Sequence, residues 1–358
     1  MALPITIPAG TQLYKYQLTA RIGGGGFGDV WLARDLTIAK DVAVKILEAG
    51  TTTIDERLIE ARIGNQLNHQ NLVKIHYADV VHYSGLDLVL IVMDYHGSGS
   101  VLGQVNAGNF LTLPQAKACL IDILRGLEYL HELGIYHSDI KPNNILIGPN
   151  GEHLLTDYGI SCLSPTLGPV APRNAYRLHI APEVLNSMQI DAHTDVYQLG
   201  LTAFRLLNGI GTLHDKYNRI GDAAFIDLVQ RGTLIQANDY QPFVPRALKT
   251  VINKAISVNP VDRYQSTLDM RRAIEGLAFP GYWSCSATGQ LRGHSGEYQF
   301  HFEENILPSG TFNFTALKTN WNNGRVTKIG PYCGRKLSRK HTEELKKRFM
   351  QFVVTGNP

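Results

Sequence analysis

The amino-acid sequence predicts an α+β fold in which strands and helices occupy separate stretches of the chain. Strand-like patterns are concentrated before residue 94, and apolar residues recur at helical spacing between residues 112 and 277. A further group of short alternating segments follows residue 279 and ends in one more helical pattern. With 358 residues, the chain is long enough for two or three domains.

Composition narrows the class of protein. Hydrophobic residues make up 44% and charged residues 18% of the chain, and no apolar run approaches the ~20 residues of a membrane-spanning helix. The net charge of +3 is too small to predict a nucleic-acid partner. Since the chain begins without a secretory signal pattern, we expect a soluble cytoplasmic protein with no membrane association. Four cysteines without metal-ligand spacing are expected to be reduced thiols: Cys119, Cys162, Cys285 and Cys333.

The N-terminal part is predicted to be rich in strands. Residues 1–12 contain prolines and glycines without an apolar period, so we expect a flexible lead-in there. Apolar spacing predicts a helix over residues 54–67. The strand patterns around it lie at residues 16–22, 29–33, 42–46 and 86–93.

A glycine-rich turn joins the first two predicted strands. Its sequence is Gly23-Gly24-Gly25-Gly26-Phe27-Gly28. Glycines without a Cβ allow backbone amides to approach a phosphate, although a merely flexible turn would have the same composition.

Two helical patterns organise the middle of the chain. Thr112 followed by Pro114 is a helix start, and the apolar spacing continues to Leu133. The second helix is predicted from Asp191 to Leu207.

The loop after the first of these helices concentrates chemically active residue types. Asp139, Lys141 and Asn144 supply a proton acceptor, a cation and a metal-binding amide, and Asp157 adds a carboxylate thirteen residues after Asn144. Phosphoryl transfer needs these groups, because a base must receive the acceptor proton while cations neutralise the moving phosphate. His137 is an alternative base by residue type.

This ordered set of motifs resembles the eukaryotic-type (Hanks-type) Ser/Thr protein kinase family, and the resemblance covers residues 13–277. His-Ser-Asp at 137–139 stands for the family's His-Arg-Asp, Asp-Tyr-Gly at 157–159 for Asp-Phe-Gly, and Val-Ala-Val-Lys at 42–45 for Val-Ala-Ile-Lys. A soluble bacterial member would fit the composition.

The resemblance implies a bilobal fold. It would have a small β-rich N-lobe over residues 13–94 and a larger helical C-lobe over 95–278. Residues 279–358 would add a β-rich unit that ends in a helix, for which we recognise no family. Its strand patterns lie at 298–302, 311–316 and 325–329, and its helical pattern at 342–353.

The resemblance also implies catalytic roles and cofactors. Asp139 would be the base, Lys141 its neighbouring cation, and Lys45 the phosphate-binding lysine held by Glu60. Glu56 competes with Glu60, which stands at the family's usual distance from Leu67-Asn68-His69-Gln70-Asn71. In the family His137 is a packed structural residue.

The implied cofactors are ATP and Mg²⁺, with Mn²⁺ as the alternative metal, and the implied metal ligands are Asn144 and Asp157. The implied nucleotide-binding residues are Ile22, Gly23, Gly24, Gly25, Gly26, Phe27, Gly28, Val30, Ala43, Lys45, Met93, Asp94, Tyr95, His96, Asn144, Leu146 and Asp157.

Further matches concern the segment that would receive a protein substrate. Residues 161–172 resemble an activation loop, and the Glu of Ala181-Pro182-Glu183 is expected to pair with Arg263. Asp195 is expected to bind the catalytic-loop backbone.

Three residues depart from the family pattern. Ser138 replaces an Arg that grips a phosphorylated activation loop in many members. Tyr158 replaces Phe, and its hydroxyl needs a polar neighbour. Tyr176 stands where Ser/Thr kinases usually carry a Thr that contacts the catalytic Asp and Lys.

The resulting hypothesis is an ATP- and magnesium-dependent kinase that phosphorylates Ser/Thr hydroxyls of a protein substrate. The alternatives are a pseudokinase-like module that binds nucleotide or a partner without turnover, and a small-molecule phosphotransferase. Residues 279–358 are expected to bind a regulatory partner or recruit substrate. Their basic residues predict a solvated helix face or, alternatively, a partner or nucleic-acid surface: Arg335, Lys336, Arg339, Lys340, Lys346, Lys347 and Arg348.

Overall fold

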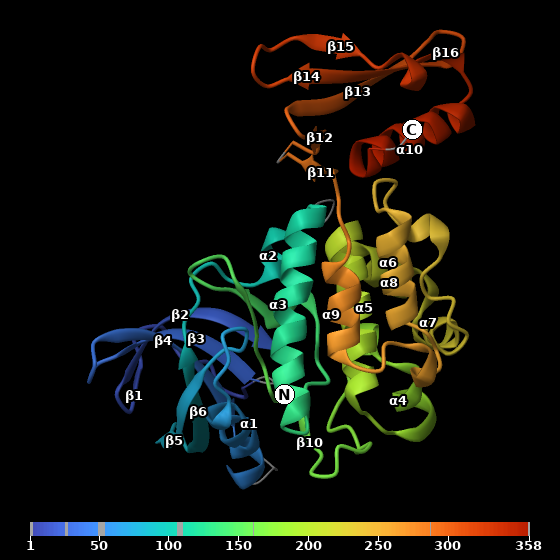
Figure 1. Ribbon diagram of the computed structural model, residues 1–358. Coiled ribbons are helices and arrows are strands. Elements are labelled where there is room, and N and C mark those ends of the chain that lie inside the picture. The colour runs from blue at the N-terminus through green and yellow to red at the C-terminus, as the bar shows by residue number, and fades with distance from the viewer. Residues whose placement is uncertain are drawn as a thin grey trace.

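The computed structural model describes residues 3–25, 28–48, 54–105, 110–159, 161–286 and 288–356, apart from the side chains at positions 25 and 55–57. Within these residues, a six-stranded sheet comes first, helices lie beside it, and a second six-stranded sheet with one helix stands at the far end of the helices (Figure 1).

The N-terminal sheet is antiparallel, with the strand order β1-β2-β3-β4-β6-β5. The central strands β4 and β6 are nearly continuous apolar runs, because both of their faces are buried. Helix α1 (Ile54–Gln66) packs against β5 and β6. The strands are β1 (Gln12–Leu13), β2 (Tyr16–Gly25), β3 (Gly28–Asp35), β4 (Lys40–Glu48), β5 (Ile75–Tyr83) and β6 (Leu86–Asp94).

The chain before β1 contributes to the apolar core of this sheet. Ile7 is buried, and Leu3 and Ile5 pack against the same apolar cluster. The flexible lead-in expected over residues 1–12 therefore does not describe residues 3–12. The alternation of apolar side chains gives this segment one face that packs against the sheet.

The helical part is organised around α5 (Ala192–Asn208), which is buried along nearly its whole length. A helix that is apolar on most sides lies at the centre of a fold. Asp191 caps its first turn, and α3 (Leu113–Glu132) packs beside it after a capping box formed by Thr112 and Gln115. The remaining helices and 3-10 turns are α2 (Val101–Gln104), α4 (Pro182–Ser187), α6 (Gly211–Ile220), α7 (Asp222–Gln230), α8 (Arg246–Ala255), α9 (Thr267–Glu275), η1 (Pro142–Asn144), η2 (Arg177–His179), η3 (Ala237–Asp239) and η4 (Pro260–Asp262).

Four short strands connect α3 to the segment before α5. Strand β7 (Ile135–Tyr136) pairs with β10 (Cys162–Leu163), and β8 (Ile145–Ile147) pairs with β9 (His153–Leu155). These pairings bring the loop after β7 next to the loop after β9. Among the described residues, none of the helices combines the length and the apolar character needed to span a bilayer.

The C-terminal unit, residues 281–355, is a sheet covered on one face by helix α10 (Arg339–Thr355) (Figure 1). Trp283 is fully buried, and its indole N–H donates to the backbone carbonyl of Met350 in α10 at 3.0 Å. The strand order is β11-β12-β13-β14-β15, and β16 also pairs with β14. The elements are β11 (Gly281–Cys285), β12 (Leu291–Ser295), β13 (Tyr298–Ile306), β14 (Phe312–Asn320), β15 (Val326–Lys328), β16 (Gly334–Leu337) and η5 (Gly330–Tyr332).

This C-terminal unit contacts the helical part at the N-terminal end of α3 (Figure 1). Gln351 of α10 donates to the backbone carbonyls of Pro242 and Val244, which precede α8. The 20 residues of α3 span about 30 Å, and the loop with Asp139 follows the opposite end of that helix. The described residues of the C-terminal unit therefore contribute no side chain to that loop.

Candidate active site

The loop that follows β7 is held by helix α5. Both oxygens of the buried Asp195 carboxylate accept backbone N–H groups, from His137 at 2.9 Å and from Ser138 at 2.8 Å. Gln198 accepts a hydrogen bond from the backbone N–H of Ile140 at 2.9 Å and donates to the carbonyl of Ser138. Because α5 is itself buried, the loop backbone is fixed and its side chains take defined positions.

Two side chains of this loop contact the carboxylate of a third, Asp139. The Nζ of Lys141 lies 2.9 Å from Oδ1 and 2.7 Å from Oδ2 of Asp139. The Nδ2 of Asn144 donates to Asp139 Oδ2 at 2.9 Å and to the Asp139 backbone carbonyl. These charge-assisted bonds orient a carboxylate that is almost completely buried. Among the described residues, nothing donates to the Oδ1 of Asn144.

A second charged group joins β4, α1 and the loop after β9. The Nζ of Lys45 lies 2.9 and 2.7 Å from the two carboxylate oxygens of Glu60 and 2.8 Å from Oδ1 of Asp157. Burial alone would lower the pKa of Lys45, but Asp157 and Glu60 raise it above its ordinary value, so the ammonium stays charged. Burial alone would raise the pKa of Asp157, but Lys45 holds the pKa of that carboxyl below its ordinary value.

Glu60 is the carboxylate that the structure places against Lys45. Burial raises the pKa of Glu60, whereas Lys45 acts to lower it. Glu60 lies one turn after Glu56 on the same helix and is buried. The side chain of Glu56, the competing candidate, lies outside the described residues.

Backbone geometry at Asp157 and Gly159 keeps this group closely packed. Asp157 adopts a left-handed conformation with φ of 70°. A Cβ at Gly159 would lie 3.1 Å from the Glu60 carboxylate and 3.2 Å from Oδ1 of Asp157. Glycine therefore allows the chain to pass directly beside the two carboxylates.

Members of both charged groups line one cavity of about 580 Å³, namely Lys141 and Asn144 of the first group and Lys45, Glu60 and Asp157 of the second. Asp139 contacts this lining through Lys141 and Asn144. Most residues expected to bind a nucleotide line the cavity: Ile22, Gly23, Gly24, Gly28, Val30, Ala43, Lys45, Met93, Asp94, Tyr95, His96, Asn144, Leu146 and Asp157. Gly26 and Phe27 lie outside the described residues, and the surroundings of Gly25 are also undescribed. Residues that the sequence had not assigned to a nucleotide pocket also line it: Gly97, Gly99, Ser100, Asn143, Thr156 and Tyr176.

The cavity suits a nucleotide in size and in the character of its walls. Pockets for small ligands measure about 300–1,000 Å³ and combine apolar walls with a few polar groups. Val30, Ala43 and Leu146 supply apolar surface, and the buried Nε2 of His96 has no partner among the described residues. Gly28 has φ of 102°, and a Cβ there would collide with the backbone oxygen of Ile46. Glycine is therefore needed at this position of the cavity wall.

Asn144 and Asp157 could hold a divalent metal together with a nucleotide. Within the described ranges, no group of three or more His, Cys, Asp or Glu residues is placed to hold a metal by itself. Mg²⁺ is usually bound by one or two carboxylates and by phosphate oxygens of the substrate. The free Oδ1 of Asn144 and the carboxylate of Asp157 fit a metal that binds with a nucleotide.

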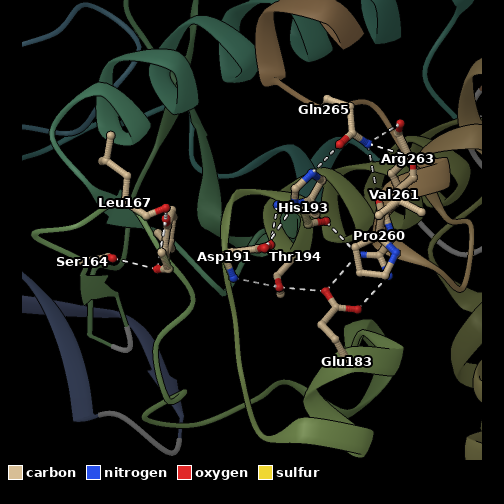
Figure 2. A network of polar contacts seen from close by, with 12 residues as sticks. Ser164, Leu167, Glu183, Asp191, His193, Thr194, Pro260, Val261, Arg263 and Gln265 are labelled. Carbon is tan, nitrogen blue, oxygen red and sulfur yellow. Dashed lines mark hydrogen bonds and ion pairs between the residues drawn. The ribbon is translucent and has the colours of Figure 1, made fainter.

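A separate ion pair ties α4 to the segment after η4 (Figure 2). The Nη1 and Nη2 atoms of Arg263 lie 2.8 and 2.7 Å from the two carboxylate oxygens of Glu183. Thr194 donates to the same carboxylate at 2.8 Å. The expected pairing of Glu183 with Arg263 is therefore present, and it lies away from the cavity lining.

Comparison with known proteins identifies the family of the chain. The family model for the protein kinase domain matches residues 16–272. The chain belongs to the protein kinase family. This confirms the family predicted from the motifs, with its β-rich N-terminal and helical C-terminal parts.

The curated relatives of this kinase include proteins from bacteria and a plant. Serine/threonine-protein kinase PknB of Mycobacterium leprae is 29% identical over 266 residues, which cover 72% of this chain and 42% of PknB. Serine/threonine-protein kinase PrkC of Bacillus subtilis is 29% identical over 269 residues, 73% of this chain and 40% of PrkC. Serine/threonine-protein kinase 1 of Arabidopsis thaliana is 34% identical over 216 residues, 58% of this chain and 25% of that protein. The chain thus spans about two fifths of the length of PknB and PrkC.

His137 of this kinase is a packed residue with both ring nitrogens engaged. Its Nδ1 accepts the backbone N–H of Asp139 at 3.2 Å, and its Nε2 lies 3.1 Å from the carbonyl of Thr156. Burial lowers its pKa, and its ring packs edge-on against Tyr158. A ring with no free nitrogen cannot accept a proton from a substrate, so this geometry excludes His137 as the catalytic base.

Tyr158 keeps the aromatic packing of the family's Phe and adds hydrogen bonds. Its hydroxyl donates to the carbonyls of Leu155 at 3.1 Å and Val73 at 3.3 Å. Backbone carbonyls are thus the polar neighbours that the hydroxyl of a buried tyrosine requires. Ser138 is another residue that differs from the family pattern. Its hydroxyl is buried and has no hydrogen-bond partner in the described part of the chain.

Proposed function

We propose that this chain transfers the γ-phosphoryl group of ATP to Ser or Thr hydroxyls of a protein substrate, with a divalent metal ion. The observation that carries this proposal is one cavity lined by Lys45, Glu60 and Lys141 and by the metal-ligand candidates Asn144 and Asp157. The Asp139 carboxylate is bonded directly to Lys141 and Asn144 of this lining. Phosphoryl transfer depends mainly on positioning and charge stabilisation, and these side chains are positioned by buried hydrogen bonds.

Six polar side chains at the cavity have defined roles in this proposal. Asp139 accepts the proton of the substrate hydroxyl, and Lys141 neutralises charge beside it. Lys45, held by Glu60, binds the α- and β-phosphates. Asn144 and Asp157 hold Mg²⁺, for which Mn²⁺ could substitute, and the bound metal supplies charge neutralisation for the phosphates.

A protein substrate is supported by the segment before α4. Glu183 is fixed by Arg263 and Thr194, so the backbone of residues 181–183 has a rigid connection to the helical part (Figure 2). A fixed surface of this kind suits an extended polypeptide better than a small molecule. A pseudokinase is not favoured, since Lys45, Asp139 and Asp157 are all retained.

We also propose a division of the chain at residues 94 and 278 into an N-lobe, a C-lobe and an additional unit. The C-terminal unit serves regulation or substrate recruitment, because it lies about 30 Å from the loop with Asp139. Lys340 and Lys347 are exposed on α10 and have no carboxylate within ion-pair distance among the described residues. Charge reversal at both positions should weaken phosphorylation of a natural substrate and leave that of a short peptide unchanged. The cytoplasmic location and the absence of a nucleic-acid partner stay predictions.

The test of the proposed function is phosphate transfer from γ-labelled ATP to a generic Ser/Thr protein substrate. Wild-type protein should transfer label with Mg²⁺ or Mn²⁺ and lose this activity in excess chelator. The Asp139→Asn variant should bind ATP as wild type does and transfer label at a rate lower by about 100- to 10,000-fold. ATP binding without transfer by wild type would instead favour the pseudokinase alternative.

A further inference from the structure

Tyr176 lies in the active-site cavity, directly beside Lys141. Its ring centroid is 4.6 Å from the Nζ of Lys141, and Tyr176 lines the same cavity as Lys141 and Asp157. The ammonium of Lys141 thus contacts both oxygens of the Asp139 carboxylate and the face of an aromatic ring. A ring face attracts a cation without neutralising it, because the ring carries no formal charge.

Buried hydrogen bonds of His179 fix the chain segment that carries Tyr176. The Nδ1 of His179 lies 2.8 Å from the carbonyl of Ile140 in the catalytic loop, and its Nε2 lies 2.9 Å from Nη1 of Arg205. Arginine can only donate, so Nε2 accepts from Arg205 and Nδ1–H donates to Ile140. The rings of Tyr176 and His179 pack with centroids 5.4 Å apart. One histidine therefore connects the catalytic loop, the segment of Tyr176 and helix α5.

Arg205 is the third residue of this network and donates to His179. It extends from α5, is 5% exposed, and has no carboxylate within ion-pair distance among the described residues. Burial lowers the pKa of the Arg205 guanidinium, and the neighbouring Tyr176 acts to raise it. A buried cation without a carboxylate needs polar partners, and His179 provides one of them. The ring of Tyr176 thus packs against Lys141 and against a histidine that Arg205 holds.

We propose that Tyr176 is a positioning residue that holds the ammonium of Lys141 against Asp139, and that Arg205 and His179 hold Tyr176 in place. This inference rests on the proposed function, because Lys141 acts there beside the base. The aromatic ring takes the place at which the family usually has a threonine hydroxyl.

The test compares Tyr176→Leu with wild type in the full chain, under saturating ATP and substrate. The variant should lower kcat by about 3- to 30-fold and leave the KM for ATP and the KM for a peptide substrate unchanged. Tyr176→Phe keeps the ring face and should lose less activity than Tyr176→Leu. Tyr298→Leu is the matched control, since Tyr298 also contacts a lysine, Lys318, at 4.6 Å but lies in the C-terminal unit; it should have wild-type kcat.

A double-mutant cycle shows whether Tyr176 acts through Lys141. Under enzyme excess, Tyr176→Leu should have no further effect on the residual rate of Lys141→Ala, because the cation that the ring holds is absent. An equal fold-loss in both backgrounds would overturn the inference. So would an effect confined to the KM for the peptide, which would make Tyr176 a substrate contact. An inactive wild-type protein would count against the proposed function, whereas an active wild type with an equally active Tyr176→Leu would count against this inference alone.

Discussion

Two buried ion pairs of this kinase, Lys45 with Glu60 and Arg263 with Glu183, have similar distances and different surroundings. Arg263 uses all five of its N–H groups: two donate to Glu183, and three donate to backbone carbonyls of Ser257, Val258 and His193. The three N–H groups of Lys45 are directed at two carboxylates. In the pair of Arg263 and Glu183, every N–H group of the arginine has a partner, so we call this pair closed. The pair of Lys45 and Glu60 faces a cavity, so we call it open.

The difference lies in the charge that each site leaves uncompensated. Around Lys45, two carboxylates share one ammonium, and Asp139 and Lys141 add one charge of each sign. Asp94 also lines the cavity, and Lys40 at 3.1 Å balances its charge. The described part of the cavity therefore carries one excess negative charge beside the free Oδ1 of Asn144. That excess favours a divalent cation, whereas the Arg263 site has no charge left to attract one.

The largest effect is expected when the excess charge is removed. Asp157→Asn should reduce metal-dependent phosphate transfer by roughly 1,000-fold or more, because a metal ion supplies several kcal/mol of charge stabilisation. Its melting temperature should stay that of wild type. Asp41→Asn, which removes an exposed ion pair with Arg34, is the control and should keep full activity. Initial rates with labelled ATP are the measurement, and wild-type activity in Asp157→Asn would refute the metal assignment.

The closed pair should respond in stability. Arg263→Met leaves the Glu183 carboxylate without its partner and should lower the free energy of unfolding by about 3–5 kcal/mol. Denaturant unfolding followed by circular dichroism measures this loss. ATP affinity of the remaining folded protein should be unchanged. A loss below about 1 kcal/mol, typical of an exposed pair, would show that the site is not the structural link described here.

The open pair should respond in activity. Lys45→Met should lower phosphate transfer by about 10- to 100-fold, since misplacing the phosphates by about 1 Å is sufficient for such a loss. Glu60→Ala should have a similar effect. The double variant should be as active as the less active single variant, because the two residues act as a unit. Glu56→Ala is the control. If Glu56→Ala were impaired and Glu60→Ala were not, the assignment of the glutamate would be wrong.

The smallest expected effect is the loss of folding stability at acidic pH. Burial, and then the charge of Arg205, hold the pKa of His179 well below its ordinary value of 6.5, and burial lowers that of His137. The unfolded chain binds these protons first as the pH falls, so stability is fully present above pH 6.5 and decreases below it. Each histidine should contribute up to about 1.4 kcal/mol per pH unit.

His179→Gln tests this acid sensitivity directly. The amide can donate to Ile140 and accept from Arg205 without titrating. The free energy of unfolding measured between pH 7.5 and 5.5 should therefore fall less steeply in the variant than in wild type. Identical slopes would show that His179 does not account for the acid sensitivity.

Motifs with a fixed chemical role were predictable from the sequence, and so were the elements with strong periodicity. The helix after Thr112 begins at the predicted cap, and β4, β6 and α5 are long apolar or alternating runs. The partner of Arg263 was also predictable from the motif order. By contrast, Tyr176 could be recognised only as a departure, because its contact with Lys141 joins residues that are 35 positions apart.

The strands that the sequence analysis missed have physical reasons for weak patterns. β5 is an edge strand with mixed polar and apolar residues. β11 and β12 contain Gly281 and Gly293, where a Cβ would press against Val353 of α10. Glycine permits that close helix packing and at the same time removes the strand signal.

The most direct test of the account is the chemical identity of the phosphorylated residue after reaction with γ-labelled ATP. The full chain, a mixed protein substrate and Mg²⁺ should yield phosphoserine or phosphothreonine, detected by hydrolysis and separation of the labelled amino acids. The same reaction with Asp157→Asn should yield no label above background. Label found only on tyrosine or only on small molecules, or ATP binding by wild type without any transfer, would contradict the assignment of this cavity as a Ser/Thr phosphoryl-transfer site.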